Sequence, residues 1–383
     1  MSNTSRTDAR GKASDAQRVT VSFAAIDPFI QEQIIAPTEK RMTGRDIVSW
    51  GERNNYPDYI LELIENVPTL DSIIEGCTDY ITGDRQTLSA EVHTSTPAPE
   101  WVPALVRALA RDYESFGGCA IQVIRAADGS VASLHHLDIR FVRSNKDNTV
   151  FYYSEDWKKP GSAIVYQAFM PDVQERWPLL SDAERDEHAS TVLYIKNDGR
   201  HTYPRPPFAA AVKAAEMERG IDTFHLSALE NGFTSSAIVN FNNGQPASDQ
   251  IREEVEENFN QKNAGAANAG RVILSWNDNK DSATTIEEFK VEDFGEKYKS
   301  LASRARQQLF TAFRANPNLF GIPTENLGFS NEEYESAFRL FNRTHVRPIQ
   351  RIICDAFDLI FGIPGVLTIT PFSIDGDAEQ NVN

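Results

Sequence analysis

Two long helix-forming runs with a small segment between them limit the folds open to this chain more than any other feature. The first run covers residues 206–231 and begins at two consecutive prolines, which suit a first helical turn. The second run covers residues 291–314. A loop rich in Pro, Asn and Gly follows it, and a third helical run occupies residues 330–357, where Pro348 is expected to cause a kink. This arrangement predicts a strut rather than a catalytic pocket.

The segment between the first two runs, residues 232–290, reads as a compact β-α-β-β unit. It is small for a domain that folds alone, so we expect it to depend on its neighbours for stability. Its predicted helix, residues 249–262, has an acidic outer face that includes Glu253, Glu254 and Glu257. Two interpretations stay open: this face docks a basic partner, or it is only the exposed side of a small helix.

The part of the chain before the first long helix predicts a domain of α+β class. Amphipathic spacing indicates two helices that are split at Pro68, the second ending at Gly83, and a further helix that stops at Gly117. Alternating patterns then predict a hairpin around Asp128 and Gly129, followed by several more strands up to about residue 195. Residues 1–18 are polar and predict a disordered arm, and residues 19–44 predict an extended or irregular stretch.

Composition excludes several classes of protein. The 383 residues carry a formal net charge of −17, which argues against an overall basic grip on nucleic acid. The sequence contains no run of about 18 apolar residues, so no membrane span is predicted. The N-terminus does not resemble a signal peptide. The three cysteines are widely spaced, which fits a reducing cytoplasm and gives no zinc signature.

The chain lacks the common motifs of catalysis and of cofactor binding, such as GxxxxGK[ST], GxGxxG after a strand, HExxH and GxSxG. We therefore expect neither enzymatic activity nor a cofactor. His135 and His136 are neighbours on a predicted strand, so their side chains should face opposite ways and not share a metal. Asp222 and His225 lie three residues apart on the first long helix, where a surface hydrogen bond is the favoured interpretation. Cys354 is expected in the core.

A basic ladder occurs in the third helical run. Four arginines recur every four residues and therefore drift slowly around one helix face: Arg339, Arg343, Arg347 and Arg351. The ladder could face a DNA-filled lumen or an acidic face of an adjacent subunit. It could also be a solvated face with ordinary local ion pairs, since Glu335 is placed to pair with Arg339.

The order of elements from Gly117 to Phe357 resembles the portal proteins of tailed bacteriophages, in their short form. The most specific match is AFRANPNLFGI followed by FSNEEYESAFRLFNRTHVRPIQRI, in which Ala312, Phe313, Pro317 and Gly321 stand in the family's Ala-Phe-x-x-x-Pro-x-x-x-Gly pattern. Further matches are ESFGGCAIQVIRAADGSVASLHHLD, TVLYIKN with a Tyr-Pro turn, ENGFTSSAIVNF and AGRVILSW. The resemblance covers about two-thirds of the chain.

The resemblance implies a homo-oligomeric ring, typically a dodecamer, at one vertex of a virion capsid, made in the host cytoplasm. Double-stranded DNA would be packaged and ejected through it. Its partners would be the terminase large subunit, the capsid and scaffold proteins and a head-tail connector, with no membrane. The implied parts are a wing at 19–205, stem helices at 206–231 and 291–314, a clip at 232–290, a tunnel loop at 315–329, a tunnel helix at 330–357, and a return strand with a loose tail at 358–383 that leaves little or no crown.

The tunnel loop would then line the narrowest part of the ring. The polar residues expected to face the channel are Asn316, Asn318, Thr324, Glu325 and Asn326. Leu319, Phe320, Ile322 and Leu327 are expected to wedge between subunits. An acidic chain with few placed cations would let DNA slide, because many lysine or arginine contacts to phosphate bind strongly. Two alternatives stay open: an enzyme of unrecognised α+β architecture, and a ring or scaffold component of a virion without DNA passage.

Overall fold

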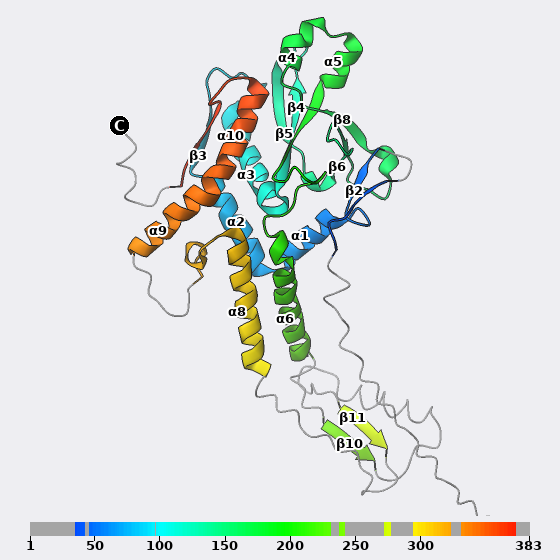
Figure 1. The fold of residues 1–383 in the computed structure, drawn as a ribbon, viewed down its shortest axis with the longest axis vertical. Coiled ribbons are helices and arrows are strands. Elements are labelled where there is room, and N and C mark those ends of the chain that lie inside the picture. The colour runs from blue at the N-terminus through cyan, green and yellow to red at the C-terminus, as the bar shows by residue number, and fades with distance from the viewer. Residues whose placement is uncertain are drawn as a thin grey trace, which may run out of the picture.

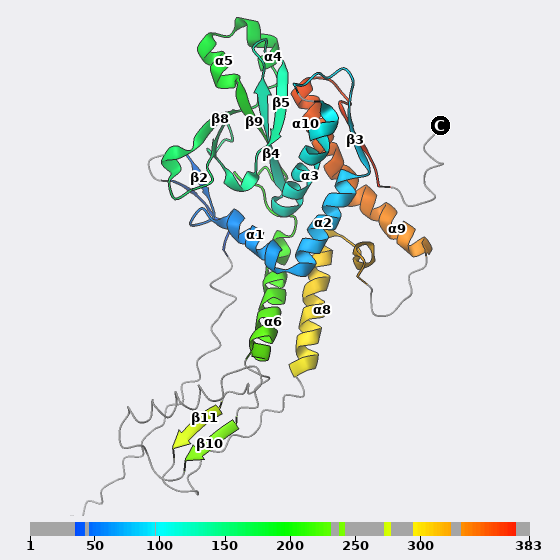
Figure 2. The same cartoon turned by 180° about the vertical axis from the view of Figure 1, so that it is seen from behind.

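The computed structural model describes residues 35–42, 46–95, 97–230, 237–241, 272–276, 294–322 and 331–372. The described chain forms a body of helices and strands from which two helices project side by side (Figure 1). A pair of short strands lies beyond the far ends of these helices in both views (Figures 1 and 2). The predicted disordered arm, residues 1–18, lies outside the described residues.

One mixed sheet forms a large part of the body and confirms the predicted α+β class. Its strands run in the order β1-β2-β6-β7-β8-β9-β4-β5. Every neighbouring pair is antiparallel except β8 with β9. The bounds are β1 Glu39–Arg41, β2 Val48–Trp50, β4 Gly118–Arg125, β5 Val131–His136, β6 Val142–Ser144, β7 Val150–Tyr153, β8 Ile164–Ala168 and β9 Ser190–Lys196. The predicted hairpin is β4–β5, which turns through Gly129 at φ 88°.

Three helices from the first part of the chain pack into the core with the sheet. They are α1 (Tyr56–Asn66), α2 (Pro68–Thr82) and α3 (Ala98–Phe116), and their buried faces follow the predicted apolar spacing. The break at Pro68 and the ends at Gly83 and Gly117 agree with the sequence-based expectation. A single hydrophobic cluster joins these helices to β4 and to the helices that follow in the chain.

Some short elements carried no recognised sequence signal. β3 (Arg85–Leu88) pairs antiparallel with the return strand β12 (Leu367–Thr370), so a segment near the C-terminus closes back on the first third of the chain. α4 (Val173–Arg176) and α5 (Asp182–His188) fill the connection from β8 to β9. Further short turns in this part of the chain are the 3-10 segments η1 (Ile139–Phe141), η2 (Pro160–Ser162) and η3 (Trp177–Leu179).

The two projecting helices are α6 (Val212–Glu230) and α8 (Phe294–Phe313). The prediction that the first helix begins at Pro206 is wrong: a 3-10 turn, η4 (Ala209–Ala211), precedes it. Hydrogen bonds from Ala209 N to Pro206 O (2.9 Å) and from Ala211 N to Phe208 O (2.7 Å) build this turn. Phe208, which caps this turn, is fully buried and stacks on Phe313, so the core fixes the chain just before the helix.

Beyond these helices, β10 (Ala237–Phe241) and β11 (Val272–Trp276) form a parallel pair with Ala237 opposite Val272. Both strands lie where the sequence predicted them. A parallel pair needs a crossover connection, and residues 242–271 are available for it. The predicted helix at 249–262, with Glu253, Glu254 and Glu257, lies outside the described residues.

The third helical run is interrupted, although not as a simple proline kink. α9 (Asn331–Phe341) leads through a π turn, η8 (Asn342–Val346), into α10 (Arg347–Phe361). The distortion comes before Pro348 because a proline ring collides with the carbonyl four residues earlier, here that of Thr344. The run also continues past the expected end at Phe357 and stops at Gly362, whose φ is 69°. Of the helices that the structure describes, none combines the length and the apolar character that a bilayer crossing requires.

Candidate functional site

The base of α6 enters the body with two buried carboxylates. Glu216 and Glu218 are each 3% exposed. The Tyr59 hydroxyl of α1 donates to Glu216 Oε1 at 2.9 Å, and the Thr69 hydroxyl of α2 donates to Glu218 Oε1 at 2.6 Å. Burial and the hydrogen bond to Glu216 raise the pKa of Tyr59, so its hydroxyl stays a donor. The helix is therefore fixed to the body through polar contacts in a dry environment.

Arginines complete this junction from both projecting helices. Arg219 of α6 pairs with Glu216 at 2.8 Å and with Glu62 of α1 at 3.2 Å. Arg306 of α8 reaches Glu218 Oε1 at 3.4 Å. These contacts hold α6, α8 and the body in one arrangement where the projection begins.

Aromatic rings align the projecting helices along their length. Phe208 and Phe313 stack at 5.6 Å beside the body, and Phe224 stacks on Tyr298 at 4.9 Å farther out. His225 lies edge-on to Tyr298 at 5.6 Å. Within 212–226, no hydrogen bond joins Asp222 to His225, so the expected surface bond between these two is wrong.

The chain leaves α8 through a short 3-10 turn, η7 (Pro317–Phe320). Asn316 Oδ1 accepts a hydrogen bond from the backbone N–H of Asn318 at 3.1 Å, so the Asn316 side chain caps the turn. The Tyr80 hydroxyl donates to Leu319 O at 2.9 Å. Both asparagines, predicted to face a channel, are partly buried beside the body. Thr324, Glu325 and Asn326 lie outside the described residues.

The described apolar side chains of this loop pack into the chain's own core, so the predicted wedge between subunits is wrong for the buried Leu319 and stays a prediction for the partly buried Phe320 and Ile322. Leu319 is 7% exposed, and Phe320 and Ile322 pack against the same core cluster. The Phe320 ring lies 5.8 Å from Phe310 and 5.9 Å from Phe341. These side chains pack within their own chain because α2 and α9 lie beside them. Leu327 lies outside the described residues.

The four arginines of the basic ladder are all exposed on α9, η8 and α10. Arg339 Nη2 pairs with Glu335 Oε2 at 3.3 Å, which confirms the predicted local ion pair. The opposite face of α10 is buried through Ile349, Ile353 and Phe357. Cys354 is half-buried and packs against this core, as expected. The π turn falls between the arginines and changes the angular step along the ladder.

The two neighbouring histidines of β5 do face different partners. His136 Nε2 lies 2.8 Å from Asp112 Oδ2 of α3, whereas His135 Nε2 lies 3.0 Å from Ser133 Oγ. Burial lowers the pKa of His136, but the hydrogen bond and charge of Asp112 outweigh it, so the pKa is raised. The contact between His136 and Asp112 fixes α3 on the sheet.

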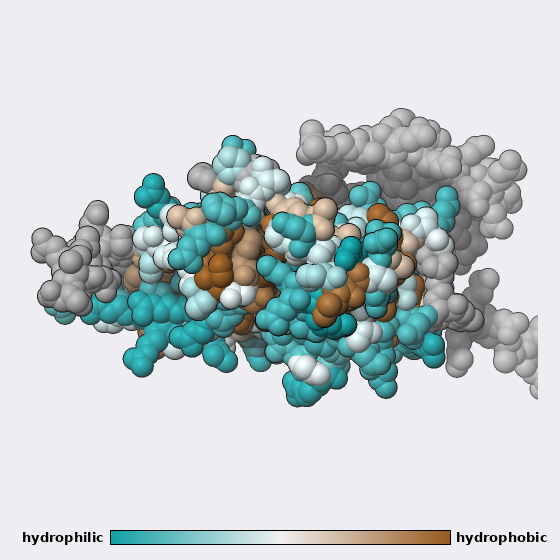
Figure 3. Space-filling view, turned by 90° about the horizontal axis from the view of Figure 1, so that it is seen from above, coloured by the Kyte–Doolittle hydropathy of each residue, from teal (hydrophilic) through white to brown (hydrophobic). Residues whose placement is uncertain are grey.

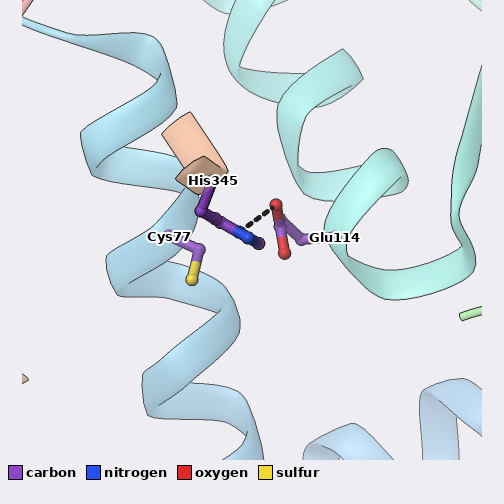
Figure 4. A group of neighbouring side chains, drawn as sticks. All are labelled: Cys77, Glu114 and His345. Atoms are coloured by element: carbon purple, nitrogen blue, oxygen red, sulfur yellow. Dashed lines mark hydrogen bonds and ion pairs between the residues drawn. The ribbon is translucent and has the colours of Figure 1, made fainter. Parts of the chain in front are cut away.

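A buried cluster that the sequence did not reveal joins α2, α3 and η8. Cys77, Glu114 and His345 come from distant parts of the chain and point toward one another (Figure 4). His345 Nε2 lies 2.9 Å from Glu114 Oε1. Burial raises the pKa of the Cys77 thiol well above its usual range. Helical periodicity places Cys77 on the apolar face of α2. Cys77, Glu114 and His345 are too far apart along the chain to form a recognisable sequence motif.

The end of the body opposite the projecting helices is mainly hydrophilic, with separate small hydrophobic areas (Figure 3). On that face no large apolar surface stands out. The exposed apolar residues include Phe224 (49%) and Leu226 (58%) on α6, and Leu340 (64%) on α9. Apolar exposure therefore also occurs on the projecting helix and on the helix after η7.

Comparison with known proteins points in one direction. The profile of the family described as Phage portal protein matches residues 96–370. A chain in the neck of a native gene transfer agent particle, computed with C12 symmetry, has a TM-score of 0.52 at 18% identity, covering 83% of this chain and 84% of that one. A chain in the virion of the native gene transfer agent particle has a TM-score of 0.53 at 17% identity, and the match covers 90% of this chain and 87% of that one. No curated protein sequence matches significantly.

Proposed function

Because the chain belongs to the phage portal protein family, we propose that it forms the ring at a capsid vertex through which double-stranded DNA enters and leaves the particle. The observation that carries this proposal is the extent of the family match. It extends from α3 to β12, limits that enclose both projecting helices, η7 and the interrupted third run. The family is one of structural proteins, so the chain's role is architectural.

The ring is a dodecamer in this proposal. The neck to which the fold is similar was computed with C12 symmetry. In a ring of this kind the body is the wing, α6 and α8 are the stem, and the segment with β10 and β11 is the clip. Polar anchoring at Glu216 and Glu218 supports this assignment, because it fixes the base of α6 on the body.

We assign the channel to the segment after α8. Residues 315–329, which include the η7 turn, form the tunnel loop, with Thr324, Glu325 and Asn326 facing the DNA. Asn316 and Asn318 hold the base of this loop. The net charge of −17 supports passage of DNA rather than tight binding. Each contact between a cationic side chain and a phosphate would increase the affinity for DNA and hinder its movement.

Partners dock at two ends of the subunit in this proposal. The acidic clip residues Glu253, Glu254 and Glu257 face the terminase large subunit during packaging and the head-tail connector afterwards. The wing contacts capsid and scaffold proteins. Changing the three carboxylates to Gln leaves the size of the segment unchanged, so a loss of terminase or connector binding would report on charge alone; unchanged binding of both would remove the docking assignment.

The deciding experiment is native mass spectrometry of the purified chain together with negative-stain class averages. We expect rings of about a dozen subunits with a central hole close to the width of a DNA duplex. A small closed oligomer without a channel would contradict the proposal and favour an enzyme. A ring too narrow for a duplex would favour a scaffold component without DNA passage.

A further inference from the structure

Three side chains with metal-ligating atoms meet inside the body. Cys77 comes from α2, Glu114 from α3 and His345 from the π turn η8 (Figure 4). One ligand atom from each lies within 4.8 Å of the other two. The three positions are held by different elements of one core, so their approach is a property of the fold rather than of a local loop.

The cluster is dry and incompletely satisfied. Cys77 and Glu114 are 0% exposed and the His345 side chain is 12% exposed. Glu114 Oε1 is bonded to His345, but Oε2 has no hydrogen-bond partner among the described residues. A fully buried carboxylate oxygen without a partner is unfavourable and requires an explanation, and a bound cation beside it is one that also accounts for the neighbouring thiol and imidazole.

The donor set selects the class of metal. A thiolate, an imidazole and a carboxylate are the ligands of Zn²⁺, whereas Ca²⁺ and Mg²⁺ take oxygen ligands. Zinc sits about 2.3 Å from sulfur and about 2.0–2.1 Å from nitrogen. Ligand atoms around it are therefore farther apart than the 2.9 Å between His345 Nε2 and Glu114 Oε1. Zinc binding therefore requires that rotation of the His345 or Glu114 side chain lengthens this distance and that the Cys77 side chain brings its sulfur closer to both.

Charge favours the same ion. One thiolate and one carboxylate balance the two positive charges of the metal, and the imidazole binds as a neutral ligand. A neutral assembly suits an interior position, where an unbalanced charge is costly.

We propose that Cys77, Glu114 and His345 bind one Zn²⁺ ion, with a fourth position left for a water molecule. The ion joins the π turn of the third helical run to α2 and α3. It would hold α9 and α10 in their arrangement on the body. This site is independent of the proposed ring, because all three ligands belong to one chain.

Metal content and a spectroscopic probe test the site. The untagged full-length protein is stripped with a chelator, exposed to Zn²⁺ or to Co²⁺, and freed of unbound metal. We expect about one zinc per chain, and with Co²⁺ a near-ultraviolet thiolate-to-metal band together with visible bands of tetrahedral cobalt. Wild-type protein that retains no zinc and shows no thiolate band would overturn the proposal without any variant.

Matched variants locate the ligands. Cys77→Ser and His345→Gln should each lower retained zinc at least tenfold, and Cys77→Ser should remove the cobalt thiolate band. Cys119→Ser alters an equally buried thiol outside the cluster and should keep both signals. A thiolate band that survives in Cys77→Ser, or disappears in Cys119→Ser, would show that the metal binds elsewhere. Circular dichroism of each variant verifies the fold, and Glu114→Gln gives a further variant of nearly unchanged shape.

Discussion

The ring of Phe320 in η7 lies directly against Gly76 in α2. A Cβ atom at Gly76 would come within 2.6 Å of Phe320 Cδ1 and 2.7 Å of its Cε1. The ring cannot move freely, because Tyr80 and Phe341 pack around it. The missing side chain at one helix position therefore fixes where the chain turns after α8.

Gly76→Ala should consequently destabilise the protein. Alanine gains about 1 kcal/mol in helix propensity, but overpacking a core contact costs about 1–3 kcal/mol. We expect a net loss of about 1 kcal/mol in the free energy of unfolding, measured by chemical denaturation. Gly220→Ala is the control: it lies in α6 with nothing within 4 Å of the added Cβ, and should stabilise by up to about 1 kcal/mol. Equal effects of the two changes would contradict the contact.

Tyr59→Phe should weaken the anchoring of α6. The change removes a buried hydrogen bond to the Glu216 carboxylate, and bonds to charged groups contribute about 1.5–3 kcal/mol. We expect a loss of about 1–2 kcal/mol, because Arg219 still pairs with the carboxylate. Tyr153→Phe removes an exposed 3.5 Å contact to Glu155 and should change stability by less than about 0.5 kcal/mol. A harmless Tyr59→Phe would show that the junction does not depend on this bond.

Arg343→Gln with Arg347→Gln tests the basic ladder. If these exposed cations contact an acidic face of the next subunit, ring assembly should weaken at least about tenfold, or about 1.4 kcal/mol, and the loss should be smaller in high salt. Intact rings with impaired packaging would place them at the channel. Arg176→Gln with Arg200→Gln is the control, since these arginines pair locally with Asp172 and Asp198. Unchanged assembly and packaging would identify the ladder as a solvated face.

Stability should fall at alkaline pH partly because of Cys119. Burial and the nearby Asp112 charge raise the pKa of this thiol well above its usual range, so the folded protein keeps the proton that the unfolded chain loses. The free energy of unfolding must then decrease as pH rises above about 9, by up to about 1.4 kcal/mol per pH unit for one thiol.

Denaturant unfolding at pH 8 and at pH 9.5 tests this contribution. Cys119→Ala should reduce the pH dependence between those values, whatever its effect on stability at pH 8. Cys354→Ala, at a half-buried thiol, should reduce it less. Identical slopes in wild type and Cys119→Ala would disprove the contribution.

Periodic elements were predictable from sequence because one period dominates in each. The breaks at Pro68, Gly83 and Gly117 and the hairpin at Gly129 were all visible as local signals. β3 was not, since its pattern is short and its partner, β12, lies nearly 280 residues further along the chain, from Leu88 to Leu367. Ser181 and Glu184 form a capping box that signals α5, so that helix was within reach of the same reasoning.

The site was less predictable, because its residues act through contacts between distant segments. The expected tunnel loop placed Leu319 and Phe320 at a subunit interface, yet α2 and α9 lie beside them, so Leu319 is buried and Phe320 partly buried within one chain. Glu216 and Glu218 looked like ordinary helix carboxylates until Tyr59 and Thr69 were brought to them. The family resemblance succeeded because it rests on the order of elements, which survives such local differences.

The π turn η8 makes the third helical run one residue longer than its core requires. Phe341 and Val346 are five positions apart, yet they are 2% and 3% exposed. Five residues of regular α-helix would place them well over 100° apart, and a π turn returns to the same face after five. Loss of one exposed residue from this turn, such as Thr344, would bring Phe341 and Val346 to a spacing of four, which places both on one face of a regular helix. The chain can therefore change length here without turning α9 away from the body.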